Sequence, residues 1–350
     1  MDAGGTKVLG VIVDRHGRVL LEQRLATFGR GRSIVDTLEE LCRGLLAAFG
    51  ATDLRDEAKE VGELASVPTG VGIAGLVDGA GVVRFAPNLH AADGTPVKTM
   101  LQERLGDAVE LYVDNDATCA GAAEWSHGSA LGLRDVVFVA LGTGIGGAIL
   151  ADGRLLRGES NFAAELGHMV IDPSGPDCGC GRRGCWELYA SGSALGRLAH
   201  AAALAGRATL VQEIAGGDPA GIRGEHVVEA AGAHDREAGA ILEEFASFVA
   251  LGLGNLASIF DPELIVIGGG LSRAGETVLG PVRDCFVSHL EGHGYRPTTT
   301  IAAAALGDRG GAVGAALLAA SRGSEPRAMG SALASRSGEE PRSHPPRGAS

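Results

Sequence analysis

Three cysteines and one histidine near the middle of the chain could together hold a metal ion. Cys178, Cys180 and Cys185 follow a Cys-x-Cys-x₄-Cys spacing, and His168 lies shortly before them. Three thiolates and one imidazole fill the four positions of a tetrahedral zinc site and leave none open for substrate. The alternative is three unrelated buried thiols, which leaves the spacing unexplained. We therefore predict a structural Zn²⁺ bound by these four residues.

Two acidic residues flank this ligand set and could act with it. Glu165 lies just before His168, and Glu187 lies just after Cys185. An ion that fixes the surrounding backbone also fixes such neighbours. Their carboxylate oxygens and the second imidazole nitrogen could then bind several hydroxyl groups at once. Sugars are ligands of this kind.

Glycine-rich segments at three places could bind phosphate groups. Residues 2–7, Asp-Ala-Gly-Gly-Thr-Lys, offer unobstructed backbone N–H groups, a hydroxyl, an ammonium and a carboxylate suited to Mg²⁺. One such segment could be an ordinary glycine turn, but similar segments recur at residues 142–147 and 268–270. Together they predict an ATP site with two phosphate clamps and an adenosine wall. The residues concerned are Gly4, Gly5, Thr6 and Lys7, then Gly142, Thr143 and Gly144, then Gly268 and Gly269.

Asn115 and Asp116 come directly after an apolar-rich run at residues 109–113 and before a small-residue segment. We expect them at a strand end that faces a cleft, where the Asp116 carboxylate could accept a proton as general base. The alternative for this pair is an Asx turn or a helix cap.

The elements that must position these residues follow a repeated pattern. Apolar strands are expected at residues 8–13 and from residue 19, after the first glycine segment. The same order returns with strands at 136–141 and 148–150 around the second glycine segment. Such a duplication predicts a two-lobed nucleotide-binding fold with its ligand in the cleft. Further strands are expected at 67–73 and 263–267, and helices at 34–49, 194–205 and 237–256.

Composition narrows the class of protein. The 350 residues are 45% hydrophobic and 21% charged, which indicates a globular chain, and no uncharged apolar stretch is long enough for a membrane helix. The net charge of −13 disfavours binding to nucleic acid or anionic lipid. The clustered cysteines and the lack of a signal peptide predict a cytoplasmic protein.

The two ends of the chain carry separate expectations. Residues 321–350 are rich in Pro and Arg and poor in bulky apolar residues, so we expect a disordered tail. At the other end the first glycine segment begins at Gly4 with no strand expected ahead of it, although a phosphate loop normally follows a strand. We hypothesise that the natural chain begins upstream of Met1. Intact-mass analysis of native protein would test this, and a native terminus at Met1 would contradict it.

Taken together, these motifs resemble the ROK family of sugar kinases, and within it the zinc-containing glucokinases of the actinobacterial type. The resemblance runs from Asp2 to about Ala320. It implies an α/β, actin-like (ribonuclease-H-like) two-lobe sugar kinase fold that forms a homodimer or homotetramer. The implied domains are a smaller lobe of residues 1–118 plus 303–320, a larger lobe of residues 119–302, and the tail at 321–350. The segments that carry it are residues 2–7, 85–88, 115–116, 141–147, 165–168, 178–187, 189–192 and 267–272.

The resemblance also implies a role for each motif in ATP-dependent phosphorylation of glucose at its 6-hydroxyl. Asp116 would deprotonate that hydroxyl, the first two glycine segments would hold the ATP phosphates with Mg²⁺, and the third would face adenosine. Thr118 and Ala3 depart from the family pattern, which usually has asparagine and isoleucine there. The residues implied to bind the other sugar hydroxyls are Asn88, Asn115, Glu165, His168 and Glu187.

The sequence also allows functions other than ATP-dependent phosphorylation of glucose. One is another ROK hexose or N-acetylhexosamine kinase, because pocket shape decides between such sugars. Polyphosphate could replace ATP as donor. A non-catalytic sugar-sensing ROK protein is a third alternative, against which the retained Asp116 counts. A ROK repressor is disfavoured, because the first glycine segment leaves no room for a DNA-binding region ahead of it.

Overall fold

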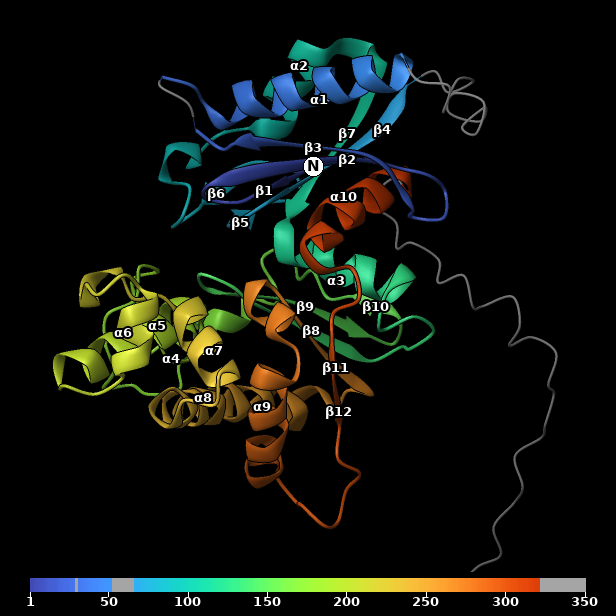
Figure 1. Ribbon diagram of the computed structural model, residues 1–350. Helices are drawn as coiled ribbons and strands as arrows, with labels where there is room; N and C mark the ends of the chain where they lie inside the picture. Colours follow the sequence, from blue (N-terminus) through green and yellow to red (C-terminus); the bar gives the residue numbers. More distant parts are fainter. Residues whose placement is uncertain (29–30, 52–65, 322–350) are drawn as a thin grey trace, which may run out of the picture.

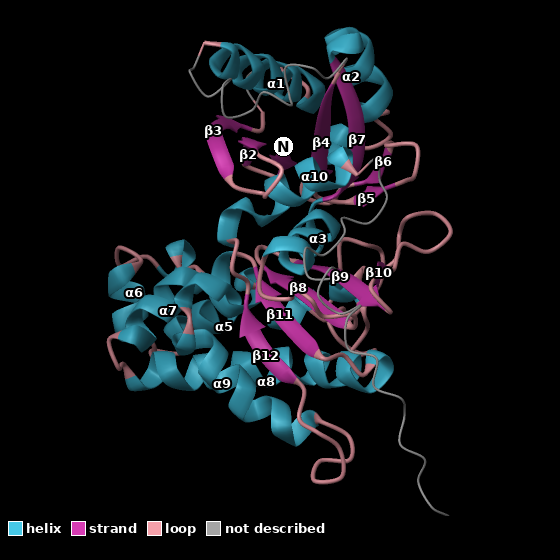
Figure 2. Cartoon of the chain, turned by 90° about the vertical axis from the view of Figure 1, so that its right-hand side faces the viewer, coloured by secondary structure: helices cyan, strands magenta, loops and turns pink. Residues whose placement is uncertain are grey.

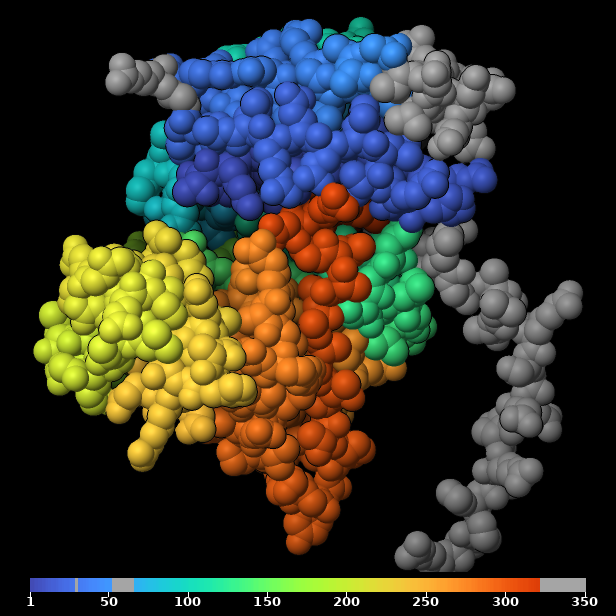
Figure 3. All heavy atoms as spheres, in the orientation of Figure 1, coloured from blue at the N-terminus to red at the C-terminus, as the bar shows by residue number. Residues whose placement is uncertain are grey.

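The computed structural model describes residues 1–28, 31–51 and 66–321. Within these ranges the chain builds two five-stranded sheets, which lie one above the other in Figure 1. We call the regions around the first and second sheets the first and second parts. Figure 3 shows that the surface is hollowed between them, on the side where α7 (Gly224–Gly232) lies. The expected tail at 321–350 lies outside the described residues, apart from Ser321.

The first sheet has the strand order β3-β2-β1-β4-β7. β1 pairs antiparallel with β2 and parallel with β4, so it lies in the middle of the sheet. The expectation that no strand precedes the first glycine segment is therefore wrong. Asp2 finds backbone partners on both sides, opposite Leu9 and Gly72, and two residues suffice to form the strand. The strands are β1 (Asp2–Ala3), β2 (Lys7–Val13), β3 (Val19–Ala26), β4 (Val67–Ile73) and β7 (Val109–Asn115).

The second sheet repeats this arrangement, with the order β10-β9-β8-β11-β12. In both sheets the first three strands in chain order pair antiparallel and the last two join parallel, which confirms the predicted duplication. The second glycine loop is shorter than predicted, because Gly146 and Gly147 pair with Ala140 and Val139 inside the sheet. The strands are β8 (Val136–Leu141), β9 (Ile145–Ala151), β10 (Arg154–Leu155), β11 (Leu264–Gly268) and β12 (Thr300–Ala303). A separate ribbon joins β5 (Leu76–Val77) and β6 (Val83–Phe85).

Helices cover the outer faces of both sheets and fill the space between them. α1 and α2 lie over the first sheet, α4 to α9 lie with the second, and α3 and α10 lie between the two (Figures 1 and 2). The predicted lobe limits near residues 118 and 303 stay a prediction. The helices are α1 (Ile34–Gly50), α2 (Val97–Leu105), α3 (Asp116–His127), α4 (Glu187–Ala190), α5 (Gly192–Leu204), α6 (Thr209–Ile214), α7, α8 (Arg236–Phe260), α9 (Glu276–His289) and α10 (Gly310–Ala320).

Local sequence explains where the longer helices begin. Ser33 and Asp36 form a reciprocal capping box at the start of α1. The side chains of Ser191 and Asp235 accept backbone N–H groups at the starts of α5 and α8. The three helices expected at 34–49, 194–205 and 237–256 are therefore found, with ends shifted by a few residues.

Close glycine contacts hold α10 between the two sheets. A Cβ at Gly314 would lie 1.7 Å from the carbonyl oxygen of Cys119 on α3, and a Cβ at Gly70 would lie 1.8 Å from that of Ala315 on α10. Only glycine allows backbones to approach so closely. These contacts account for part of the high glycine content, and they fix α3, which carries Asp116, against the first sheet.

The long helix α8 lies below the second sheet in the view of Figure 1. Its length and composition alone would allow a membrane span, but 61% of the apolar window is buried inside the structure. The Trp186 indole N–H donates to the Phe248 carbonyl oxygen at 2.8 Å, and the ring fills the space that Gly252 leaves on α8. The cysteine-containing segment is thereby anchored to the core.

Candidate active site

Asp116 is the first residue of α3, directly after the end of β7. Asn115 caps this helix: its Oδ1 accepts the Thr118 N–H at 2.9 Å, and its Nδ2 donates to the Gly75 carbonyl oxygen at 3.1 Å. The cap considered as the alternative is thus real for Asn115. The Asp116 carboxylate accepts from backbone N–H groups of its own helix start, from Ala117 at 2.8 Å and from Asp116 itself. The Asp116 carboxyl is therefore left with acceptor capacity for a ligand.

Acidic side chains gather around Asp116. Burial raises the pKa of Asp116. Burial, followed by the charge of Asp116, raises the pKa of Asp2 to about 7. Burial, followed by the charges of Asp116 and Glu187, raises the pKa of Glu165 to about 7. Carboxyl groups with raised pKa values in one place are typical of sites that move protons.

The two glycine loops present free backbone N–H groups. The first is tied down by hydrogen bonds from Gly4 N–H to the Lys7 carbonyl oxygen at 3.1 Å and from the Thr27 hydroxyl to the Gly4 carbonyl oxygen at 2.6 Å. Within the described part of the chain, the N–H groups of Gly5, Thr6, Thr143 and Gly144 have no hydrogen-bond partner. Such donors fit phosphate oxygens.

Contacts of these loops link them to other predicted site residues. A Cβ at Gly144 would lie 2.5 Å from Glu187 Oε2, and a Cβ at Gly5 would lie 3.0 Å from the Asn88 carbonyl oxygen. Both loops thus reach residues expected to bind sugar.

The third glycine cluster lies beside the second loop. Gly269 has a φ of +81°, and a Cβ there would lie 2.5 Å from the carbonyl oxygen of Leu141, the residue before Gly142. Arg273, on the 3₁₀ helix Gly270–Ala274, bonds to Asp308 at 3.1 Å. Lys7 of the first loop reaches the same carboxylate at 3.7 Å. The structure therefore brings all three glycine segments to one region.

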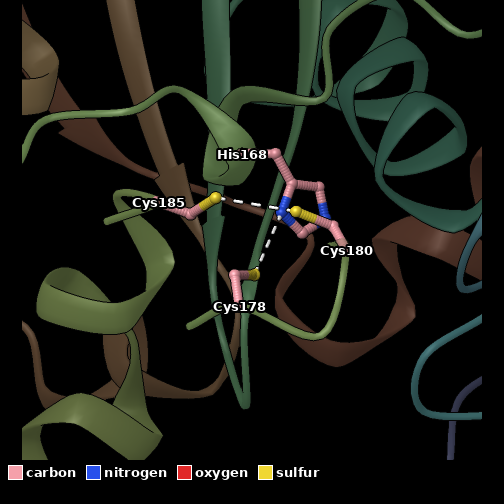
Figure 4. A group of neighbouring side chains, drawn as sticks. All are labelled: His168, Cys178, Cys180 and Cys185. Atoms are coloured by element: carbon pink, nitrogen blue, oxygen red, sulfur yellow. Dashed lines mark hydrogen bonds between the residues drawn. The ribbon is translucent and has the colours of Figure 1, made fainter. Parts of the chain in front are cut away.

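The predicted metal ligands converge as expected (Figure 4). One ligand atom each from His168, Cys178, Cys180 and Cys185 lies within 4.8 Å of the others. Cys180 Sγ and Cys185 Sγ are 3.6 Å apart, and Cys178 Sγ lies 3.7 Å from His168 Nδ1. Tetrahedral zinc with bonds of about 2.3 Å to sulfur separates its sulfur ligands by about 3.8 Å. The four side chains therefore fit a closed zinc site.

The metal cluster also touches the acidic side chains. Glu187 Oε1 lies 3.5 Å from His168 Nδ1 and accepts from Cys178 Sγ at 3.3 Å. Because His168 directs Nδ1 to the cluster, its Nε2 is left for another partner. Glu165 immediately precedes the 3₁₀ helix Leu166–His168, so one short segment carries a predicted sugar ligand and a metal ligand.

A second buried group near Asp116 was not predicted from the sequence. Asp114, 1% exposed, forms an ion pair with Arg157 and accepts from Tyr112 and Asn161. The one local signal was the run Asp114-Asn115-Asp116 at a strand end. Nothing in the sequence pairs it with a loop arginine.

The duplicated α/β architecture, with a glycine loop opening each half and the half-buried Asp116 between them, is that of the actin-like sugar kinases. The chain belongs to the ROK family, whose family model matches residues 1–322. A glucokinase from Streptomyces coelicolor is 38% identical over 91% of this chain and 96% of its own length. An N-acetylmannosamine kinase from Salmonella typhi is 32% identical over 91% of this chain and 97% of its own.

A solved structure agrees with these relatives. The ROK family glucokinase from Streptomyces griseus, in complex with glucose and AMPPNP, has a TM-score of 0.81 and 39% identity, and the alignment covers 91% of this chain and 98% of that one. The fold class predicted from the sequence is therefore confirmed.

Replacing Cys180 with serine should empty the metal cluster, because three ligands do not complete a structural zinc site. We expect about one zinc per chain in the wild-type protein and most of it to be lost from Cys180→Ser, measured by inductively coupled plasma mass spectrometry. Cys285→Ser, at a thiol on α9 outside the cluster, should keep the wild-type zinc content. Equal zinc in both variants would contradict the ligand assignment.

Asp116→Asn should stabilise the fold at neutral pH. Because burial raises the pKa of Asp116 in the folded chain, the unfolded chain ionises first as the pH rises, near the ordinary aspartate value of about 3.9. Stability is therefore lost between that pH and the raised pKa. An amide that keeps the Ala117 hydrogen bond avoids this loss. We expect a higher midpoint of thermal unfolding than wild type at about pH 7.5 and nearly the same midpoint at about pH 4.

Asp107→Asn is the matched control, because that acid is exposed. Its midpoint should follow the wild type at both pH values, as recorded by circular dichroism. If Asp116→Asn unfolds at the wild-type midpoint at neutral pH, burial of the ionised Asp116 carboxylate does not lower the stability of the fold, which contradicts this prediction.

Proposed function

We propose that this chain is a glucokinase, which transfers the γ-phosphoryl group of ATP to the 6-hydroxyl of glucose. The observation that carries the proposal is the half-buried Asp116 carboxyl, with its raised pKa and spare acceptor capacity, beside Glu165 and in the region of the glycine loops. Membership of the ROK family and the similarity to glucokinases support the choice of reaction.

In this reaction Asp116 accepts the proton of the sugar 6-hydroxyl. The freed oxygen forms a bond to the γ-phosphorus as the bond from that phosphorus to the β–γ bridging oxygen breaks, which gives ADP and glucose 6-phosphate. Positioning and charge stabilisation supply most of the catalysis in such transfers. A raised pKa makes Asp116 a stronger base once it is ionised.

The sugar would lie over the segment that the metal cluster fixes. Glu165 and Glu187 would accept from its hydroxyl groups, and His168 Nε2 would complete this side. Asn88 and Asn115 would bind from the first part, Asn115 through the Nδ2 hydrogen that Gly75 leaves free. Zinc would supply rigidity to this segment and no chemistry at the phosphoryl group.

The nucleotide would lie along the glycine segments. The free N–H groups of Gly5, Thr6, Thr143 and Gly144 would donate to phosphate oxygens, and Lys7 would add a positive charge. Gly268 and Gly269 would face adenosine. Mg²⁺ would offset charge on the phosphates, and Asp2 is the carboxylate suited to hold it.

The remaining expectations accompany this proposal. The six free cysteines support a reducing, cytoplasmic environment. The proposal includes a smaller lobe of residues 1–118 with 303–320 and a larger lobe of residues 119–302. A homodimer or homotetramer also remains part of the proposal, as do the absence of nucleic-acid and membrane partners.

The second candidate is an N-acetylhexosamine kinase, favoured by the 32% identity to an N-acetylmannosamine kinase. The acidic groups and glycine loops would serve either sugar. The difference lies in whether the pocket admits an N-acetyl group in place of a hydroxyl.

The test is an ADP-release assay with ATP and Mg²⁺ across glucose, mannose, fructose, N-acetylglucosamine and N-acetylmannosamine. We expect kcat/KM for glucose to exceed that for each other sugar by at least about tenfold, because unmatched polar groups in the pocket penalise the wrong sugar. A preference for an N-acetylated sugar would favour the second candidate.

Two controls sharpen this assay. 6-Deoxyglucose lacks the accepting hydroxyl, so it should bind without ADP release above background. Polyphosphate in place of ATP tests the donor. Sugar binding without turnover on any substrate would indicate a sugar sensor.

A further inference from the structure

An ion pair between buried Asp114 and half-buried Arg157 joins the end of β7 to the loop that follows β10. Asp114 is 1% exposed, and Arg157, 24% exposed, binds its Oδ2 through Nη1. The Tyr112 hydroxyl donates to the same oxygen at 2.8 Å. Asn161 Nδ2 and the Asn115 N–H donate to Oδ1 at 3.0 and 2.8 Å. Both carboxylate oxygens therefore hold two donors each.

The partners come from the two halves of the duplicated fold. Tyr112 and Asp114 lie on β7 of the first sheet, whereas Arg157 and Asn161 lie between β10 and the Leu166–His168 helix of the second part. Asn161 Oδ1 also accepts from Arg157 Nη1 at 3.1 Å, and its Nδ2 reaches the Val77 carbonyl oxygen at 3.0 Å. The loop is thus fixed on β7 and on β5 at once.

Each side of this network continues directly into the candidate active site. Asp114 lies two residues before Asp116, and Asn161 lies four residues before Glu165. The Ala163 N–H donates to the Arg157 carbonyl oxygen at 3.1 Å, which closes the loop from Arg157 to Ala163, two residues before Glu165. The ion pair and the Asn161 hydrogen bond therefore link the segment that bears Asp116 to the segment that bears Glu165.

Stability alone does not explain this arrangement. The buried Asp114 carboxylate and the half-buried Arg157 guanidinium lose hydration that an apolar pair of similar size would not lose. In addition, Arg157 Nη2 is buried and has no hydrogen-bond partner among the described residues, which adds a further cost. What the network does supply is a fixed distance and orientation between two chain segments.

We propose that Arg157, through Asp114, is a positioning residue that sets Asp116 against the Glu165 segment for phosphoryl transfer. This inference rests on the proposed function. Neither Arg157 nor Asp114 is assigned contact with the sugar or ATP, so both act through the backbone that they hold.

The test compares Arg157→Met, Arg157→Lys and the double variant Asp114→Asn with Arg157→Met. Arg157→Met leaves Asp114 buried and unpaired, so kcat should fall about a hundredfold and thermal stability should drop. KM for ATP should stay within about threefold of wild type, since the glycine loops are untouched. Arg157→Lys should recover part of kcat, because one ammonium restores the charge without the two-point contact to Asp114 and Asn161.

The double variant separates positioning from a structural role. It removes both charges, so the midpoint of thermal unfolding should return toward wild type while kcat stays at least about tenfold low. Recovery of kcat together with stability would overturn the proposal, and so would wild-type kcat in Arg157→Met. If Arg157→Met does not fold, the double variant and Arg157→Lys still give both readouts.

A matched control is Arg134→Met, which removes an arginine paired with Asp152 at an exposed turn beside β8 and β9 of the second sheet. Its kcat and stability should remain at wild-type values. Absence of sugar phosphorylation by the wild-type chain would defeat the proposed function itself, whereas an active wild type with a fully active Arg157→Met would defeat only this inference.

Discussion

The structure depends on holding acidic side chains together in a place where water cannot fully solvate them. Burial and the charges of neighbouring acids raise the pKa of Asp2 and Glu165 to about 7, and burial raises the pKa of Asp116. Such a group of carboxyls works against folding. It persists because rigid packing surrounds it, and that same packing gives the acids the fixed geometry that phosphoryl transfer requires.

Two kinds of packing supply this rigidity. Between the sheets, Gly70 and Gly314 let α10 contact β4 and α3 at backbone distance, so the helix that begins with Asp116 cannot shift. In the second part, Trp186 docks the cysteine segment on α8, and the Cys₃His cluster fits an ion that would hold Glu187 and His168 in place. The duplicated sheets then bring the corresponding loops of each half toward one another.

Much of the site could be predicted from local sequence, and the rest could not. The Cys₃His cluster was predictable because its spacing is short and its chemistry specific. The duplicated topology was predictable because a glycine segment beside apolar runs occurs before β2 and again between β8 and β9. β1 was missed because two residues carry no periodic pattern, and Gly146 and Gly147 resemble loop residues although β8 pairs with them. The Asp114–Arg157 pair spans 43 positions and exists only once the two halves meet. No pattern within one segment could indicate it.

The central claim is that Asp116 is the base for transfer of a phosphoryl group to sugar. The most direct measurement is kcat of Asp116→Asn with glucose and ATP-Mg²⁺, together with the glucose Kd from isothermal titration calorimetry. The account predicts a loss of at least about a hundredfold in kcat, since general-base catalysis contributes about 10² to 10⁴, with a glucose Kd close to that of wild type. A variant that binds glucose normally and turns over at the wild-type rate would contradict the claim.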